Sequence, residues 1–143
     1  MNCRIGPMTI DDYDEVLALW KACEGIGLSS ADSRESIAVF LNRNPGLSCV
    51  ARRDGQLVGA VLCGHDGRRG YIHHLAVNES CRREGVGRDL VAACLRGLQR
   101  IGVQKCHVFV FADNSDAIVF WRGIGWTRRD ELTMMSRSIP DQA

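Results

Sequence analysis

One stretch in the middle of the chain decides the fold, the run YIHHLAVNESCRREGVGR at residues 71–88. A mostly apolar strand pattern gives way to a short polar loop, and a helical pattern then starts at the glycine pair Gly85 and Gly87. The first N–H groups of a helix have no partner within it and carry the positive end of its dipole. Glycine lets an anion approach the backbone closely, and Arg82, Arg83 and Arg88 add positive charge. The stretch therefore predicts a cradle for phosphate groups.

The spacing of the glycines separates this cradle from two common phosphate-binding motifs. A Walker A loop needs a Gly-Lys-Ser/Thr ending, which this stretch lacks. A dinucleotide fingerprint needs a third glycine where this chain has Leu90. The spacing that is present is Arg-x-x-Gly-x-Gly, formed by Arg82, Gly85 and Gly87.

Hydrophobic periodicity on either side of this stretch predicts alternating strands and helices. A capping-box pattern at Thr9–Asp12 opens a helix over 13–23, and Asp54-Gly55 is typical of a type I′ hairpin turn. The strand–helix–strand unit from 71 to 112 predicts a right-handed parallel crossover. The apolar strand 103–112 should be central and covered on both faces. The expected strands are 1–8, 47–53, 56–64, 71–77, 103–112 and one or two within 126–139, and further helices follow residues 33, 85 and 115.

These elements predict a mixed α/β fold with helices on both faces of a six- or seven-stranded sheet. With 143 residues, the chain should form a single domain over 1–143. Its 18 Lys and Arg residues nearly balance 17 Asp and Glu residues, which argues against binding to nucleic acid. No apolar run is long enough to cross a membrane, and no signal peptide is visible, so we expect a cytoplasmic location.

The cysteines predict neither disulfides nor a metal site. There are seven, an odd number, and no two of them form a CxxC pair. Most stand inside apolar stretches, as Cys49 does between Ser48 and Val50. We therefore expect reduced thiols that pack as small hydrophobic side chains, and no bound metal.

Three further features fit the cradle and together suggest a family. Val77 closes the strand before it, and Asn114 caps a helix after the next strand. The run FWRGIGW at 120–126 is similar to a Phe-Tyr-x-x-x-Gly-Phe signature. With the Arg-x-x-Gly-x-Gly spacing, the sequence resembles the GCN5-related N-acetyltransferase (GNAT) family along nearly its whole length. The loop GHDGRRG at 64–70 resembles that of small, uncharacterised bacterial members.

The resemblance implies acetyl-CoA as co-substrate and an amine as its acceptor. The pyrophosphate would lie on backbone amides from Arg82 to Gly87, and the pantetheine arm beside the end of strand 71–77, where it splays from 103–112. An amide near Leu75 or Ala76 would meet the thioester carbonyl and stabilise the developing oxyanion. The resemblance assigns the co-substrate contacts to Leu75, Ala76, Val77, Arg82, Arg83, Glu84, Gly85, Val86, Gly87, Arg88, Asn114 and Trp121.

The candidate base is a histidine in strand 71–77. An amine is mostly protonated at pH 7, so a base that titrates near ~6.5 suits the reaction. Strand alternation puts His73 on one face with Tyr71, Leu75 and Val77, and His74 on the other with Ile72 and Ala76, unless a bulge intervenes. His73 stands where serotonin N-acetyltransferase, a family member, has an active-site histidine. We therefore expect His73 to be the base; a structural role for His73, or His74 as the base, are the alternatives.

The acid that protonates the leaving thiolate is less clear. The family's tyrosine is replaced by Trp121, whose indole N–H donates a hydrogen bond but does not titrate usefully. Trp121 can line the thiol site or donate a hydrogen bond there, and Tyr71 or water could supply the proton. This departure leaves two functions open: direct transfer of acetyl to a primary amine of a metabolite or peptide in a ternary complex, or a non-catalytic acyl-CoA-binding sensor. Asp32 is the one charged residue of the loop 25–32, which argues against a polycationic acceptor. The resemblance also makes a homodimer possible, because members of the family commonly form one.

Overall fold

The computed structural model describes residues 3–141, which form two compact units. The first ends at Phe111 and the second begins at Ala112. The strands are β1 (Arg4–Pro7), β2 (Cys49–Arg53), β3 (Gln56–His65), β4 (Gly70–Val77) and β5 (Cys106–Val108). The α-helices are α1 (Tyr13–Ala22), α2 (Arg34–Arg43), α3 (Val86–Arg100) and α4 (Ser115–Gly123). Residues 1, 2, 142 and 143, which the expected first strand and the expected domain 1–143 include, lie outside the described range, and the single domain stays a prediction.

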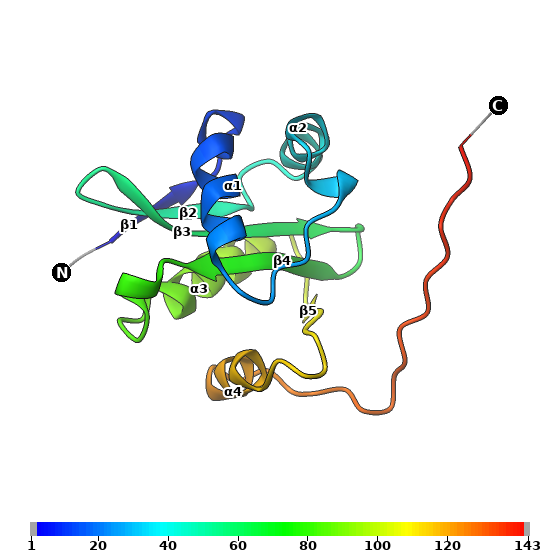
Figure 1. Ribbon diagram of the computed structural model, residues 1–143. Helices are drawn as coiled ribbons and strands as arrows, with labels where there is room; N and C mark the ends of the chain where they lie inside the picture. Colours follow the sequence, from blue (N-terminus) through cyan, green and yellow to red (C-terminus); the bar gives the residue numbers. More distant parts are fainter. Residues whose placement is uncertain (1–2, 142–143) are drawn as a thin grey trace. The chain divides into compact units, whose positions relative to one another are not determined.

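A five-stranded mixed sheet in the order β1-β2-β3-β4-β5 forms the centre of the first unit. The first four strands pair antiparallel, and β5 pairs parallel with β4 after the α3 crossover. Asp54 and Gly55 both have positive φ, 52° and 80°, as a type I′ turn between β2 and β3 requires. Helices α1 and α2 cover one face of the sheet and α3 covers the other (Figure 1). The predicted mixed α/β fold is confirmed.

The predicted count of six or seven strands is wrong, and the error lies in the last third of the chain. The strand expected over 103–112 is ordered as a strand only at Cys106–Val108, and it lies at the edge of the sheet rather than in its centre. Beyond it, Phe109 and Phe111 are 58% and 59% exposed, so an apolar run did not mean burial on both faces. No strand forms among the described residues 126–141, where charged side chains such as Arg128 and Asp130 pair locally at 2.6 Å.

The main core lies between the sheet and the α1–α2 layer. Trp20 and Val16 of α1 are each 1% exposed, and Ile37 of α2 is 2% exposed. These side chains pack on the small residues of β3 and β4, among them Ala60 and Ala76. On the opposite face, a Cβ at Gly59 would lie within 2.9 Å of Leu90 of α3, so the glycine allows that helix to approach closely.

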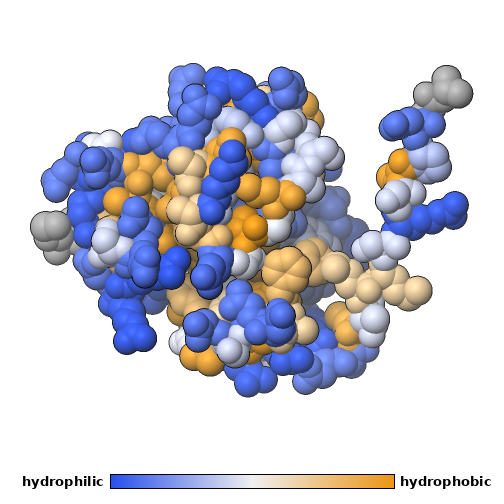
Figure 2. Space-filling view, viewed as in Figure 1, coloured by the Kyte–Doolittle hydropathy of each residue, from blue (hydrophilic) through white to orange (hydrophobic). Residues whose placement is uncertain are grey.

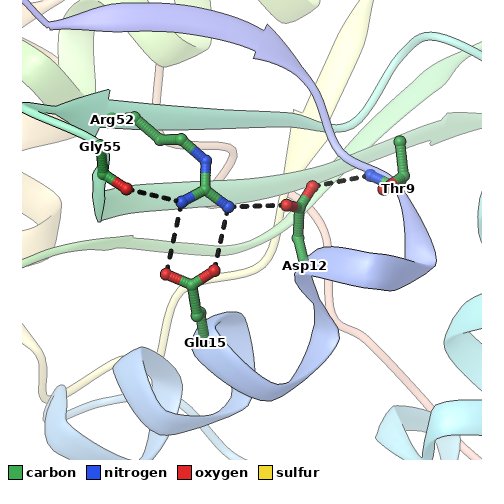
Figure 3. A network of polar contacts seen from close by, with 5 residues as sticks. All are labelled: Thr9, Asp12, Glu15, Arg52 and Gly55. Atoms are coloured by element: carbon green, nitrogen blue, oxygen red, sulfur yellow. Dashed lines mark hydrogen bonds and ion pairs between the residues drawn. The ribbon is translucent and has the colours of Figure 1, made fainter.

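A network around Arg52 fixes the start of α1 to β2 (Figure 3). The guanidinium of Arg52 lies 2.7 Å from Asp12 and 3.1 Å from Glu15, and it also donates to the carbonyl of Gly55 at 3.1 Å. The backbone N–H of Thr9 donates to Asp12 at 2.9 Å, which completes the predicted capping box. The network thereby sets the direction in which α1 runs across the sheet toward β4.

All seven cysteines are free thiols, as expected. Cys49, Cys63, Cys81 and Cys94 are buried, and burial together with the neighbouring Cys63 raises the pKa of the Cys106 thiol to about 12. Within residues 3–141 no group of three or more His, Cys, Asp or Glu side chains has the arrangement of a metal site. In the same range no helix has both the length and the apolar character needed to cross a membrane.

Candidate active site

A β-bulge in β4 brings two histidines to one side of the sheet. Ala76 pairs with Ala60 and His73 with Leu62, so β4 advances three residues where β3 advances two. His74 takes up the extra residue with a positive φ of 52°. The alternation that placed His73 and His74 on opposite faces is therefore wrong, because the bulge that could shift it is present. Both histidines line the same cavity.

Trp20 of α1 holds the bulge in place. Its indole Nε1 donates to the carbonyl oxygen of His74 at 3.1 Å, and its ring meets the His74 ring edge-on, with the centroids 5.0 Å apart. A left-handed backbone is unfavourable for a residue with a side chain. A buried indole N–H also needs an acceptor. One hydrogen bond satisfies the buried donor and stabilises the strained residue.

Asp32, from the segment between α1 and α2, is the partner of His74. It lies in the single turn of 3₁₀ helix Ser30–Asp32 before α2, and it is only 8% exposed. Its Oδ1 lies 2.9 Å from His74 Nε2, while its Oδ2 accepts the backbone N–H of Ser29 at 3.0 Å. The Tyr13 hydroxyl donates to the Asp32 carbonyl at 2.6 Å. These partners are what make a buried carboxylate tolerable, and they fix its position.

The cavity has a volume of about 300 Å³ and lies between the α1–α2 loop, α2 and β4. Its apolar wall comes from Ile37, Phe40 and Leu62. Figure 2 shows hydrophobic side chains reaching the surface between α1 and α2. Asp32 is the one carboxylate among the lining residues, which are Gly27, Ser29, Ala31, Asp32, Ile37, Phe40, Leu62, His73 and His74.

His73, the predicted base, lies in this cavity as a half-buried side chain. Its ring meets Phe40 edge-on at 6.1 Å between centroids. Burial lowers the pKa of His73, repulsion from His74 lowers it further, and the Asp32 carboxylate opposes both. A lowered pKa keeps this imidazole neutral at pH 7, so it can accept a proton there.

Tyr71, the predicted alternative acid, is placed apart from the histidines. Its ring stacks on Phe109 with an interplanar angle of 18° and a centroid distance of 6.2 Å, and it lies 5.6 Å from the His107 ring. Tyr71 is not among the residues that line the cavity. The Phe111 ring lies at the edge of the cavity, because a Cβ on the lining residue Gly27 would come within 3.3 Å of it.

The predicted phosphate cradle is a tight turn that ends where α3 begins at Val86. Arg83 and Gly85 both have positive φ, 65° and 86°. Such reversals turn successive backbone N–H groups toward one point and form anion-binding concavities. The free N–H groups of the first helical turn, which includes the buried Gly87, lie next to this turn. The backbone of the predicted cradle therefore fits a pyrophosphate.

The charged side chains of the cradle mostly hold the turn itself. Arg82 Nε donates to the carbonyl of Val77 at 3.2 Å, which ties the loop to the end of β4. Glu84 pairs with Arg53 of β2 at 2.8 Å. The Arg88 guanidinium lies over Gly85, where a Cβ would come within 2.9 Å of it. The Arg83 side chain is exposed and makes no hydrogen bond or ion pair within residues 3–141, so the backbone rather than the side chains defines this region.

The gap predicted between β4 and its neighbour is present in the first unit. β4 and β5 pair only through Gly70, Tyr71 and Ile72 of β4. Over the described residues, His73–Val77 have no strand partner on that edge. Leu75 is half-buried and Ala76 is buried there. An open strand edge that leads to an anion-binding turn fits an extended ligand with a phosphate group at one end.

The last predicted site residues, Asn114 and Trp121, belong to the second unit. The Asn114 side chain accepts the backbone N–H of Ala117 at 3.1 Å, so it caps α4 as predicted. Trp121 is buried and packs edge-on against Phe120 and Trp126, with centroid distances of 5.3 Å and 4.8 Å. The structure thus gathers His73, His74 and Asp32 in the first unit. Sequence reasoning kept His74 as an alternative base and used Asp32 only as the one charge of the loop 25–32; it did not predict their contact, although Ser29-x-x-Asp32 is a readable capping box.

Comparison with known proteins identifies the family. The family model described as "Acetyltransferase (GNAT) family" matches residues 13–126. An acetyltransferase of Pectobacterium atrosepticum is 31% identical over 132 residues, which cover 92% of this chain and 93% of that protein. An acetyltransferase of Yersinia pseudotuberculosis has the same identity and coverage. The chain belongs to the acetyltransferase (GNAT) family and is an N-acetyltransferase.

Solved structures share the fold at lower identity. The PaiA N-acetyltransferase of Thermoplasma acidophilum, solved with coenzyme A, has a TM-score of 0.79 at 18% identity, over 91% of this chain and 92% of that one. Ard1 of Thermoplasma volcanium has a TM-score of 0.78 at 22% identity, over 89% and 84% of the two chains. The acetyltransferase AAC(6')-Iy, bound to a bisubstrate analogue that contains CoA, has a TM-score of 0.79 at 17% identity, over 97% and 100%.

Proposed function

We propose that this chain transfers acetyl from acetyl-CoA directly to a primary amine that enters the cavity beside β4, in a ternary complex, with His73 as the base. The observation that carries the proposal is the position of His73. It lines a cavity of about 300 Å³ together with a buried carboxylate, and burial lowers its pKa. The relatives named acetyltransferases and the neighbours solved with CoA support the same co-substrate.

His73 has one task in this scheme, to remove the proton that blocks the amine. An amine arrives as an ammonium ion at pH 7 and cannot attack while it keeps its extra proton. A neutral His73 accepts that proton, directly or through one water. The freed nitrogen forms a bond to the acetyl carbon as the carbon–sulfur bond breaks, and the second proton that this nitrogen loses passes to water, which supplies the proton of the departing thiolate. Acetyl-CoA contributes an acyl group that is already activated as a thioester.

The remaining predicted contacts have supporting roles. The amides near Leu75 and Ala76 would donate to the carbonyl oxygen as negative charge develops on it. The turn from Arg82 to Gly87, which includes Glu84 and Val86, would hold the pyrophosphate with Arg88 alongside. We assign no acid role to Tyr71, because its ring packs on Phe109 outside the cavity lining. A thiol has a pKa of about 8.5, so water can protonate the departing thiolate without an acid side chain.

The test is a coupled assay for free CoA, run with acetyl-CoA and a panel of primary amines. We expect at least one amine to release CoA in proportion to the N-acetyl product found by mass spectrometry. Thermal-shift measurements with CoA alone form a parallel arm. Stabilisation by CoA without turnover on any amine would contradict the proposal and favour the non-catalytic sensor. Absence of stabilisation as well would contradict the assignment of the cradle.

A further inference from the structure

From the cavity we infer the class of acceptor: a small primary amine with a single positive charge and an apolar substituent, whose ammonium group is recognised by Asp32. This inference rests on the proposed function, because it assumes that the acceptor occupies the cavity between the α1–α2 loop and β4. It goes further in assigning a specificity role to Asp32, with His74 as the residue that positions it.

The charge of the cavity favours one ammonium group. Among the described residues that line the cavity, Asp32 supplies the one carboxylate and none is Lys or Arg. Both carboxylate oxygens already have a donor, from His74 at 2.9 Å and from the Ser29 N–H at 3.0 Å. Each oxygen has a second lone pair, so each can accept another hydrogen bond. A fixed, buried carboxylate is therefore able to receive one cation without first becoming ordered.

The position of this carboxylate matches the chemistry proposed for His73. Asp32 holds His74, the residue next to His73 in the chain, and all three line one cavity. An ammonium group bound at Asp32 would consequently lie next to an imidazole able to take its proton. Trp20 of α1 stabilises this arrangement, because its indole N–H donates a hydrogen bond to the His74 carbonyl at 3.1 Å.

The rest of the cavity is apolar and small. Ile37, Phe40 and Leu62 form its wall, and the Phe111 ring lies against Gly27 at its edge. A volume of about 300 Å³ equals the share of roughly ten liquid water molecules. That volume suits a compact apolar group on the amine. A polycation would place its further charges against this apolar wall or leave them in solvent, with no second carboxylate to meet them.

The test compares two acceptors of nearly equal shape and different charge. 2-Phenylethylamine is an ammonium ion at pH 7, while O-benzylhydroxylamine has the same length and is neutral. In Asp32→Asn we expect KM for 2-phenylethylamine to rise about 10- to 100-fold, the effect of losing a hydrogen bond to a charged group. KM for O-benzylhydroxylamine should change by less than ~3-fold, because a neutral acceptor does not use the charge.

Two further variants separate recognition from folding. Asp54→Asn removes the same charge from the exposed hairpin turn, and its KM for both acceptors should equal that of the wild type. His74→Gln keeps a donor for Asp32 and should retain the preference for the ammonium ion. An equal rise of both KM values in Asp32→Asn would overturn the inference, since it would indicate a structural role. A wild-type preference for spermidine, tobramycin or a peptide amine would also overturn the inference about Asp32, but it would leave the proposed acetyl transfer intact. Failure of every amine would overturn both.

Discussion

The cradle at the start of α3 and the cavity beside His73 are built in opposite ways. The cradle is continuous in sequence and its shape comes from backbone: positive φ at Arg83 and Gly85 and the free N–H groups of one helix turn. The cavity is made of side chains from segments more than 40 residues apart, as the Asp32–His74 contact shows. In the proposed function the cradle binds the co-substrate and the cavity binds the acceptor, so only the cavity has to differ from one acceptor to another.

This difference predicts how substitutions divide. A change in the cavity should affect the amine and the chemical step, and a change in the cradle should affect acetyl-CoA. A substitution in one region that altered the response to both substrates would show that the two regions are not independent.

His73→Ala should have the largest effect. Loss of a general base typically costs ~10²-fold or more, and we expect kcat/KM for the amine at pH 7 to fall by that factor. KM for acetyl-CoA should stay the same, because His73 lies outside the cradle. Steady-state kinetics with both substrates varied provide the measurement. His107→Ala, at the β5 edge, is the control and should retain kcat/KM; an active His73→Ala enzyme would remove His73 from the mechanism.

The pH profile should show the lowered pKa of His73 directly. Only the neutral imidazole accepts a proton, and burial holds its pKa below the ordinary value of about 6.5. We therefore expect kcat/KM to be flat at pH 7 and to fall tenfold per pH unit only on the acid side of the lowered pKa. 2-Phenylethylamine as the acceptor remains an ammonium ion throughout that range, so the limb reports the base and not the amine. The acid limb should disappear in His73→Ala, and a limb centred above pH 6.5 would contradict the assignment.

Gly85→Ala should raise KM for acetyl-CoA by roughly 10-fold, because an L-residue in the left-handed region costs about 1–2 kcal/mol and the turn would relax away from its shape. kcat should change little. Gly102→Ala is the matched control, since Gly102 has the same φ, 86°, in the turn that follows the opposite end of α3. Both variants should lose similar thermal stability, but only Gly85→Ala should weaken acetyl-CoA; an equal KM in the two would mean that the cradle is misplaced.

The sequence predicted the turn before α3 and most of the fold because both depend on local rules. The capping box at Thr9, the type I′ turn at Asp54 and the start of α3 after Gly85 each require only a few neighbouring residues. The same holds for α1, which runs from Tyr13 to Ala22 within the helix expected over 13–23.

The errors arose where an outcome depends on distant partners. The apolar residues of 103–112 are compatible with a central strand, but β5 is an edge strand because no described segment pairs with its other side. The face of His74 could not be predicted from alternation, because the bulge depends on a hydrogen bond from Trp20, 54 residues away. Asp32 acquires its role only when the chain brings it to His74.

Trp20→Phe should give the smallest effect and test how far the bulge depends on α1. The variant loses the hydrogen bond to the His74 carbonyl, a loss of about 1 kcal/mol, and leaves a small void in the core. We expect Tm to fall by several degrees, as a loss of that size does in a domain of this length. KM for the amine should rise about 3-fold as His74 and Asp32 shift, by less than the ~5-fold that 1 kcal/mol represents. KM for acetyl-CoA should not change. Trp126→Phe in the second unit controls for the loss of an indole, and a larger effect of Trp20→Phe on acetyl-CoA than on the amine would show that the bulge supports the cradle rather than the cavity.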